Sequence, residues 1–124
     1  MSTTKNNCSL GYPEVITRLP KAQIPFEGTK AWILQSENQQ LIFFEFEGGM
    51  GVPPHSHTYP QWGIVIDGKM ELVVDGDPRL CEKGTEYLIP AGTMHSARFF
   101  ARTRLIDFFS EKYRYKTKSS VPGK

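Results

Sequence analysis

The chain has 124 residues, with 11 Gly and 9 Pro, and 15 Lys or Arg against 13 Asp or Glu. This length leaves room for one domain and not two, and the Gly and Pro content suits a fold rich in turns. Hydrophobic residues make up 39% of the chain, which excludes a wholly disordered protein. The net charge of +2 argues against a dedicated binder of nucleic acid or of a membrane surface.

The two ends of the chain and its cysteines indicate the compartment and the domain limits. The N-terminal residues contain no apolar stretch that could serve as a signal-peptide core, and no segment has the length of a membrane span, so we expect a cytoplasmic protein. Cys8 and Cys81 lack a CxxC partner and are expected to be reduced. We interpret residues 1–13 as an N-terminal arm, 14–110 as the folded domain and the basic 111–124 as a flexible tail.

In the first part of the chain, short runs of β-forming residues alternate with Pro and Gly. Three of these runs are predicted strands: 14–18, 31–35 and 41–46. In the third run, Ile42, Phe44 and Phe46 share one face by period-two alternation. We expect that face to be part of the core.

From residue 63 onward, glycines recur every eight residues, at positions 68, 76, 84 and 92. Two of them follow aspartate, and Asp-Gly between apolar runs is typical of a hairpin turn, because the turn requires positive φ at its central residues. The runs around these glycines are predicted strands: 62–66, 70–74, 87–89, 95–100 and 104–109. No stretch longer than about ten residues keeps helical periodicity without a Gly or Pro interruption. The pattern predicts an all-β antiparallel barrel or sandwich with little helix.

The chain has three histidines, and their spacing is informative. His55 and His57 are two residues apart, so both imidazoles project from one face of an extended chain. Gln61 has the same parity if the extension continues, and His95 belongs to a later strand. A closed β barrel could bring these four side chains together, where three imidazoles and an amide oxygen suit one divalent ion of Mn, Fe, Co, Ni or Zn. The alternative is that the His-x-His pair is surface decoration or a core pair.

The residues around the histidines form two motifs. Gly49, His55, His57, Gln61 and Gly68 form G-x5-H-x-H-x3-Q-x6-G, and Gly84, Pro90, Gly92 and His95 form G-x5-P-x-G-x2-H. These motifs resemble the two signature motifs of the cupin family in residue type and spacing at nine positions. The resemblance, to small RmlC-like cupins of one domain, implies a double-stranded β-helix, which is a jelly-roll barrel with a metal ion inside. It also implies a homodimer.

Two positions depart from the cupin motifs. Gln61 replaces the usual glutamate and Phe99 replaces the usual asparagine. Because Gln carries no charge, three neutral imidazoles and one amide leave the full +2 charge on the metal. Such a site favours an anionic small-molecule ligand, for instance a carboxylate or an enolate. The alternative is that water takes the place of Gln61.

The last predicted strand carries an acid among apolar neighbours. Leu105, Asp107 and Phe109 share one face, and Arg104 lies on the other. If the first face points inward, Asp107 lies in an apolar cavity near a cation, where it could act as a general acid or base with a shifted pKa. If the second face points inward, Arg104 is the pocket residue instead. We favour Asp107 inward, because a buried Arg needs an anion.

The segment 105–110 also resembles the D-x-F segment that ends the barrel of cupins that ketonise unsaturated uronates from pectin and alginate breakdown. Those cupins use His, His, Gln and His around the metal, and the resemblance implies that Asp107 and Phe109 lie beside it. Where they often carry an arginine further along the chain, Tyr113 and Arg114 stand here.

Six side chains are candidates for lining a substrate pocket: Tyr59, Trp62, Met70, Phe99, Phe109 and Arg104. A core role is the alternative for the aromatic residues and the methionine. The site as a whole favours a metal-dependent enzyme that isomerises or ketonises an unsaturated sugar acid, with Asp107 moving the proton. An Fe(II) oxygenase and a non-catalytic cupin that binds a small molecule are the alternatives.

Overall fold

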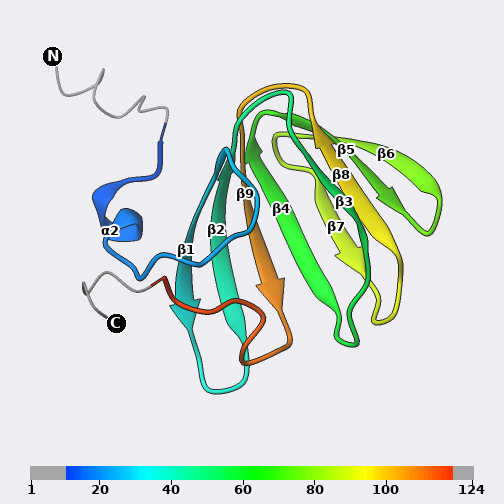
Figure 1. Ribbon diagram of the computed structural model, residues 1–124. Helices are drawn as coiled ribbons and strands as arrows, with labels where there is room; N and C mark the ends of the chain where they lie inside the picture. The colour runs from blue at the N-terminus through cyan, green and yellow to red at the C-terminus, as the bar shows by residue number, and fades with distance from the viewer. Residues whose placement is uncertain (1–10, 119–124) are drawn as a thin grey trace, which may run out of the picture.

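The structure is a computed structural model that describes residues 11–118, which form two antiparallel sheets packed against each other (Figure 1). Its strands are β1 (Thr29–Gln35), β2 (Gln40–Phe46), β3 (Gly51–His55), β4 (Gln61–Asp67), β5 (Lys69–Val74), β6 (Asp77–Glu82), β7 (Glu86–Ile89), β8 (His95–Phe99) and β9 (Thr103–Phe109). A short helix, α2 (Glu14–Thr17), precedes them. Within the described range, no helix is long and apolar enough to cross a membrane.

The strand order is that of a jelly roll. One sheet has the order β1-β2-β9-β4-β7, and the other has the order β3-β8-β5-β6. The late strand β8 lies between β3 and β5, and β9 lies between β2 and β4. Residues distant in sequence are therefore side by side (Figure 1). This arrangement confirms the predicted all-β jelly-roll barrel with little helix.

The tight turn between β5 and β6 is the Asp-Gly turn that the sequence predicts. Asp75 and Gly76 form the two-residue loop, with φ of 52° and 78°, as a type I′ turn requires. Two strands, β3 and β6, have no counterpart among the predicted ones. β3 contains two prolines and β6 has one buried residue among six, so neither shows the apolar alternation of a half-buried strand.

The predicted strand 14–18 is wrong, because this segment forms α2. The amides of Ile16 and Thr17 donate to the Pro13 carbonyl at 2.9 and 3.1 Å. Pro13 has a φ of −69°, which suits the start of a helix. The negative charge of Glu14 in the first turn interacts favourably with the positive end of the helix dipole. Val15 is 74% exposed. Valine favours strands mainly because its side chain packs against neighbours on a half-buried sheet, and Val15 has no such packing here.

Residues 111–118 are held against the rest of the chain rather than free. Thr117 forms an antiparallel bridge with Ala22, and the ring of Tyr115 packs edge-on against Phe44 at 5.8 Å. The prediction of a flexible tail is therefore wrong for 111–118, because counting charges does not reveal where an aromatic ring packs. The rest of the predicted tail, 119–124, and residues 1–10 of the predicted arm lie outside the described residues.

The core lies between the two sheets. Ile42, Phe44 and Phe46 point into it from β2, as their alternation predicts. Phe46 stacks on Phe99 of the opposite sheet with ring centroids 4.1 Å apart, which joins the sheets. Four of the polar or charged residues buried in the described part of the chain are predicted site residues: His57, Gln61, His95 and Asp107.

Candidate metal centre

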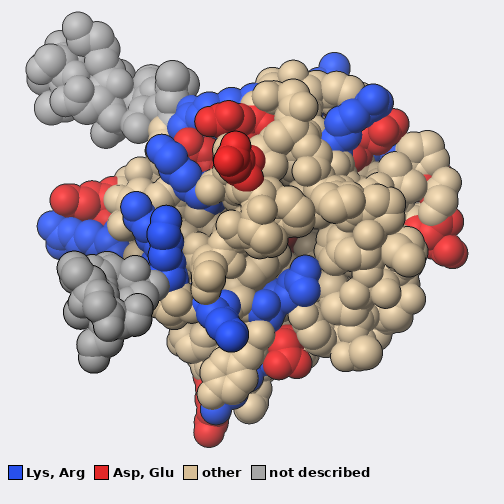
Figure 2. Space-filling model, viewed as in Figure 1, with Lys and Arg blue, Asp and Glu red and all other residues tan. Residues whose placement is uncertain are grey.

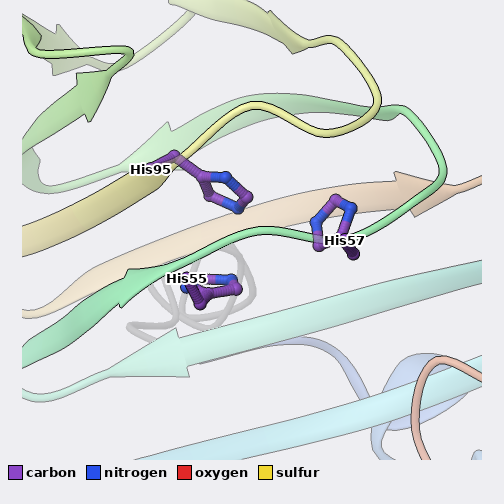
Figure 3. Close-up of side chains that lie close together, drawn as sticks. All are labelled: His55, His57 and His95. Atoms are coloured by element: carbon purple, nitrogen blue, oxygen red, sulfur yellow. The ribbon is translucent and has the colours of Figure 1, made fainter.

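The imidazoles of all three histidines converge between β3 and β8 (Figure 3). His55 ends β3 and pairs with His95 at the start of β8, while His57 lies just beyond β3. One ring nitrogen of each histidine lies within 4.8 Å of the others. The three histidines could therefore hold one metal ion between them, as their spacing predicts.

Each imidazole is oriented by a backbone carbonyl two residues away. The Nδ1 atoms of His55, His57 and His95 lie 3.1, 2.7 and 2.8 Å from these carbonyl oxygens. Because a carbonyl oxygen only accepts a hydrogen bond, Nδ1 carries the proton and Nε2 keeps its lone pair. This is the usual arrangement of a metal-binding histidine.

The charge state of the histidines also fits a metal. Burial lowers the pKa of His55 and lowers that of His95 to about 4, so both rings are neutral at pH 7. The Nε2 atom of His95 is buried and has no hydrogen-bond partner. A buried lone pair without a partner is costly, and a divalent ion such as Mn, Fe, Co, Ni or Zn would satisfy it.

Gln61, the predicted fourth ligand, lies at the start of β4 beside His57. Its Oε1 lies 3.0 Å from His57 Nε2, and its side chain also hydrogen-bonds to Asp107. Because a carboxylate accepts, the amide NH₂ faces Asp107 and the amide oxygen faces His57. The lone pairs of that oxygen and of His57 Nε2 then face each other, and a shared cation would satisfy both.

Asp107 points into the barrel from β9, the orientation that the sequence favours, and it is 6% exposed. The Tyr87 hydroxyl donates to its Oδ1 at 2.7 Å. Burial raises the pKa of Asp107 to about 6, while the hydrogen bonds from Tyr87 and Gln61 and the charge of Arg114 act in the opposite direction. The carboxyl group therefore changes protonation near neutral pH.

A glycine makes room for the pair formed by Asp107 and Tyr87. Gly63 of β4 is the cross-strand partner of both residues, one on each side. A Cβ at Gly63 would overlap Asp107 Oδ1 and Tyr87 Cζ. The two side chains therefore meet above the backbone of the strand that separates them. Tyr87 and Gly63 are not among the predicted site residues, although the alternation of Tyr87 with the apolar Ile89 could have placed the tyrosine ring inward.

A cavity of about 710 Å³ extends from this cluster between the sheets. The polar part of its wall includes His55, Gln61, His95 and Asp107. Three of the predicted pocket residues also line it: Met70, Phe99 and Phe109. Tyr59 stacks on the ring of His57 with centroids 4.5 Å apart and an interplanar angle of 8°.

Two predicted pocket residues, Arg104 and Trp62, lie on the outer face of the sheet instead. Arg104 Nη2 forms an ion pair with Asp67 Oδ2 at 2.9 Å, and Trp62 Nε1 donates to Glu86 at 3.3 Å. Placing them in the pocket was wrong because alternation along β9 and β4 puts them on the side opposite to Asp107 and Gln61.

Arg114, outside the predicted pocket set, is a basic residue of the cavity wall, as is Lys116. Its guanidinium lies 5.6 Å from the ring centre of Phe109 and 5.0 Å from that of Tyr115. Its Nε is buried without a hydrogen-bond partner. Several Lys and Arg side chains gather on the face of the molecule that carries the segments before β1 and after β9 (Figure 2). Arg114 thus adds a positive charge to the cavity wall, and its side chain also hydrogen-bonds to Tyr59 and Tyr115.

A jelly-roll barrel with a histidine cluster in its interior is the architecture of the cupins, and comparison with known families gives the same class. A family model described as a cupin domain matches residues 42–105, just over half of the chain. The chain belongs to the cupin family.

Particular cupins are similar to the chain. Quercetin 2,3-dioxygenase of Bacillus subtilis (strain 168) is 46% identical over 73% of this chain and 32% of that protein, so the chain spans about a third of this relative. The structure of KdgF from Halomonas sp. has a TM-score of 0.69 at 26% identity and covers 75% of this chain and 87% of that one. An RmlC-like cupin from Shewanella frigidimarina has a TM-score of 0.71 at 22% identity, covering 78% of this chain and 88% of that one, and shows the fold alone.

Proposed function

We propose that this cupin is a metal-dependent enzyme that isomerises or ketonises an unsaturated sugar acid. One observation carries the proposal: the protonatable Asp107 carboxyl lies against Gln61 of the candidate metal centre and lines the same cavity as Arg114. An acid–base group, a metal centre and an anion donor therefore share one cavity. The resemblance to uronate-ketonising cupins, which rests on the His, His, Gln, His set and on the D-x-F segment, supports the same reaction.

The reaction needs one proton to move and no electrons to be transferred. In the conversion of an enol to a ketone, the O–H bond breaks and a C–H bond forms at the neighbouring carbon. A bound divalent ion would polarise the oxygen on which charge develops. Asp107, ionised at pH 7, accepts the hydroxyl proton and returns a proton to carbon, for which a pKa of about 6 is well suited.

Two groups of the chain would bind and orient the substrate. Arg114 presents a buried Nε that has no partner within the protein, and a substrate carboxylate would supply one. Phe99 and Phe109 form apolar walls that exclude water from the reacting atoms. In this arrangement the carboxylate and the reacting oxygen are bound at different points, which fixes the substrate's direction in the cavity.

The test uses protein loaded in turn with Mn²⁺, Fe²⁺, Co²⁺, Ni²⁺ or Zn²⁺ and the unsaturated uronate monomers that pectate and alginate lyases release. We expect loss of the ultraviolet absorbance of the conjugated double bond with at least one metal. Turnover should fall at least a hundredfold in Asp107→Asn, since general acid–base catalysis contributes about 10²–10⁴-fold. Full turnover by Asp107→Asn would contradict the mechanism. A ligand-induced rise in melting temperature without product formation would favour a non-catalytic binder.

A second candidate function is that of an Fe(II)-type oxygenase. The match to quercetin 2,3-dioxygenase favours it, since the identity is 46% over 73% of this chain. Three histidines and one amide leave open positions at a metal, which could take substrate and dioxygen. Oxygen uptake by iron-loaded protein with a flavonol would support this function, and ketonisation without oxygen uptake would exclude it.

A further inference from the structure

Gln61 differs from the three histidines because its amide can face the candidate metal centre in two ways. The oxygen Oε1 has lone pairs that a cation can use, whereas the NH₂ group donates hydrogen bonds and has no lone pair available to a metal. The structure places Oε1 3.0 Å from His57 Nε2, on the side of the histidines. The groups that hold the amide in this orientation therefore decide whether Gln61 can be a ligand.

Three of the side chains around Gln61 do not favour this orientation. The side chains of Ile89 and Phe109, its cross-strand neighbours, are buried and apolar and offer no hydrogen bond to either end of the amide. His57 Nε2 keeps its lone pair because Nδ1 donates to a backbone carbonyl at 2.7 Å, so without a cation it attracts the NH₂ end. Asp107 accepts a hydrogen bond from Gln61 and draws the NH₂ group in the opposite direction. Because a hydrogen bond to a carboxylate is stronger than one to a neutral ring, Asp107 determines which way the amide faces.

Asp107 is in turn held by Tyr87. The Tyr87 hydroxyl donates to Asp107 Oδ1 at 2.7 Å, and the two residues are 5% and 6% exposed. Gly63 lies between them in the sheet, and a side chain there would overlap both. The terminal torsion of an aspartate is broad, so its carboxyl group rotates unless a partner fixes it. The hydrogen bond from Tyr87 keeps the carboxylate lone pairs directed at the Gln61 amide.

We propose that Tyr87 is a positioning residue of the metal centre and that it acts, through Asp107, on the orientation of the Gln61 amide. The three side chains come from neighbouring strands, β7, β9 and β4, and form a chain in which the carboxylate accepts from the hydroxyl and from the amide. The amide oxygen is then left for the cation. This role concerns metal binding and does not depend on the proposed reaction, so no substrate is needed to test it.

The measurement is the dissociation constant of Co²⁺ bound to the full chain, determined by competition with a chelating dye. Tyr87→Phe removes only the hydroxyl group and should raise this constant about tenfold, since loss of a group that orients a metal ligand costs about 10–100-fold in affinity. The visible absorption spectrum of the bound Co²⁺ should change as well, because it reports the number and kind of ligands. An unchanged dissociation constant and spectrum in Tyr87→Phe would overturn the proposal.

Tyr12→Phe is the matched control. The Tyr12 hydroxyl also makes hydrogen bonds inside the protein, to the carbonyls of Phe44 and Leu105 at 2.9 and 3.0 Å. Its ring lies on the outer face of the sheet, 5.0 Å from the guanidinium of Arg104. Both variants lose a hydrogen-bonded hydroxyl, but Tyr12→Phe should leave Co²⁺ binding and its spectrum unchanged. Equal losses of metal affinity in the two variants would show a general effect on folding and exclude a positioning role for Tyr87.

A second substitution at Asp107 separates positioning from packing. In Asp107→Asn, the hydrogen bond from Tyr87 to the asparagine oxygen turns the asparagine NH₂ toward Gln61, whose own oxygen then faces that NH₂ and not the metal. Asp107→Asn should therefore weaken Co²⁺ binding at least as much as Tyr87→Phe does. Adding Tyr87→Phe releases the asparagine, which can then turn its oxygen toward Gln61.

The effect of Tyr87→Phe should thus depend on the residue at position 107. In the Asp107→Asn background it should leave the affinity for Co²⁺ unchanged or raise it, in contrast to the loss of about tenfold expected in the wild type. The same loss in both backgrounds would contradict a role that passes through Asp107. Wild-type affinity in Asp107→Asn alone would also refute it, and a wild-type chain that binds no divalent ion would overturn it together with the candidate metal centre.

Discussion

Replacing Asp107 by asparagine should stabilise the metal-free protein at neutral pH while removing its acid–base group. Burial raises the pKa of this carboxyl from 3.8 to about 6, so the folded state binds its proton more tightly than the unfolded state does. The contribution of Asp107 to stability is therefore most favourable below about pH 4 and is lost as the pH rises through 6. A shift of this size is worth about 3 kcal/mol at pH 7, at about 1.4 kcal/mol per pKa unit.

Asparagine has nearly the same shape and never ionises. It can accept the hydrogen bond from Tyr87, but its NH₂ group faces the donor of Gln61, which offsets part of the gain. We therefore expect Asp107→Asn to raise the free energy of unfolding by about 1–3 kcal/mol at pH 7 and by less than about 0.5 kcal/mol at pH 4.

The assay is urea denaturation of the chelator-treated wild type and variant at both pH values. Asp77→Asn, at an exposed position, is the matched control and should change stability little at either pH. A variant that loses the same free energy at pH 7 and at pH 4 would refute the reasoning, because its effect would then come from packing and not from the buried charge.

Three further outcomes test other parts of the site. Gly63→Ala should cost more than about 2 kcal/mol in urea denaturation, since its methyl group overlaps the buried carboxyl and tyrosine, and unchanged stability would contradict that packing. His95→Ala should reduce the metal bound after purification without chelator to less than about a tenth of the wild-type value, measured by elemental analysis; full stoichiometry would exclude His95 as a ligand. Arg114→Ala should abolish most of the rise in melting temperature that an unsaturated uronate causes in the wild type, whereas the exposed control Arg98→Ala should keep it. Equal shifts in these two variants would exclude Arg114 as the carboxylate donor.

The structure supplies a physical reason for a glutamine at the position where cupins usually have glutamate. Gln61 stands between His57 and Asp107 and can donate to the carboxylate on one side while its oxygen faces the imidazole on the other. A glutamate would place a second negative charge beside Asp107 and would have no proton to donate at neutral pH. The carboxyl group of Asp107 on β9 and the amide group of Gln61 on β4 are thus joined by a hydrogen bond that a glutamate at position 61 could not donate at neutral pH.

Local pattern by itself determined much of this protein. The turn at Asp75-Gly76 and the alternation in β2 follow from short-range sterics and from the period of a strand, so they could be predicted from neighbouring residues. The spacing of His55 and His57 placed both rings on one face of the chain, and the cupin motifs placed His95 with them. These features depend on the chain within a few residues, or on motifs with constant spacing.

Tertiary structure decided the rest. The alternation in β9 allowed either Asp107 or Arg104 to face inward, and the choice follows from partners on other strands: Gly63 leaves space for the carboxyl, and Asp67 pairs with the arginine outside. The segment after β9 was predicted to be solvated because its basic residues are visible in the sequence. Its position against the barrel depends on the packing of the Tyr115 ring against Phe44 and Phe109. Residues distant along the chain supply these contacts, and burial, pairing and space around a side chain exist only once the sheets have come together.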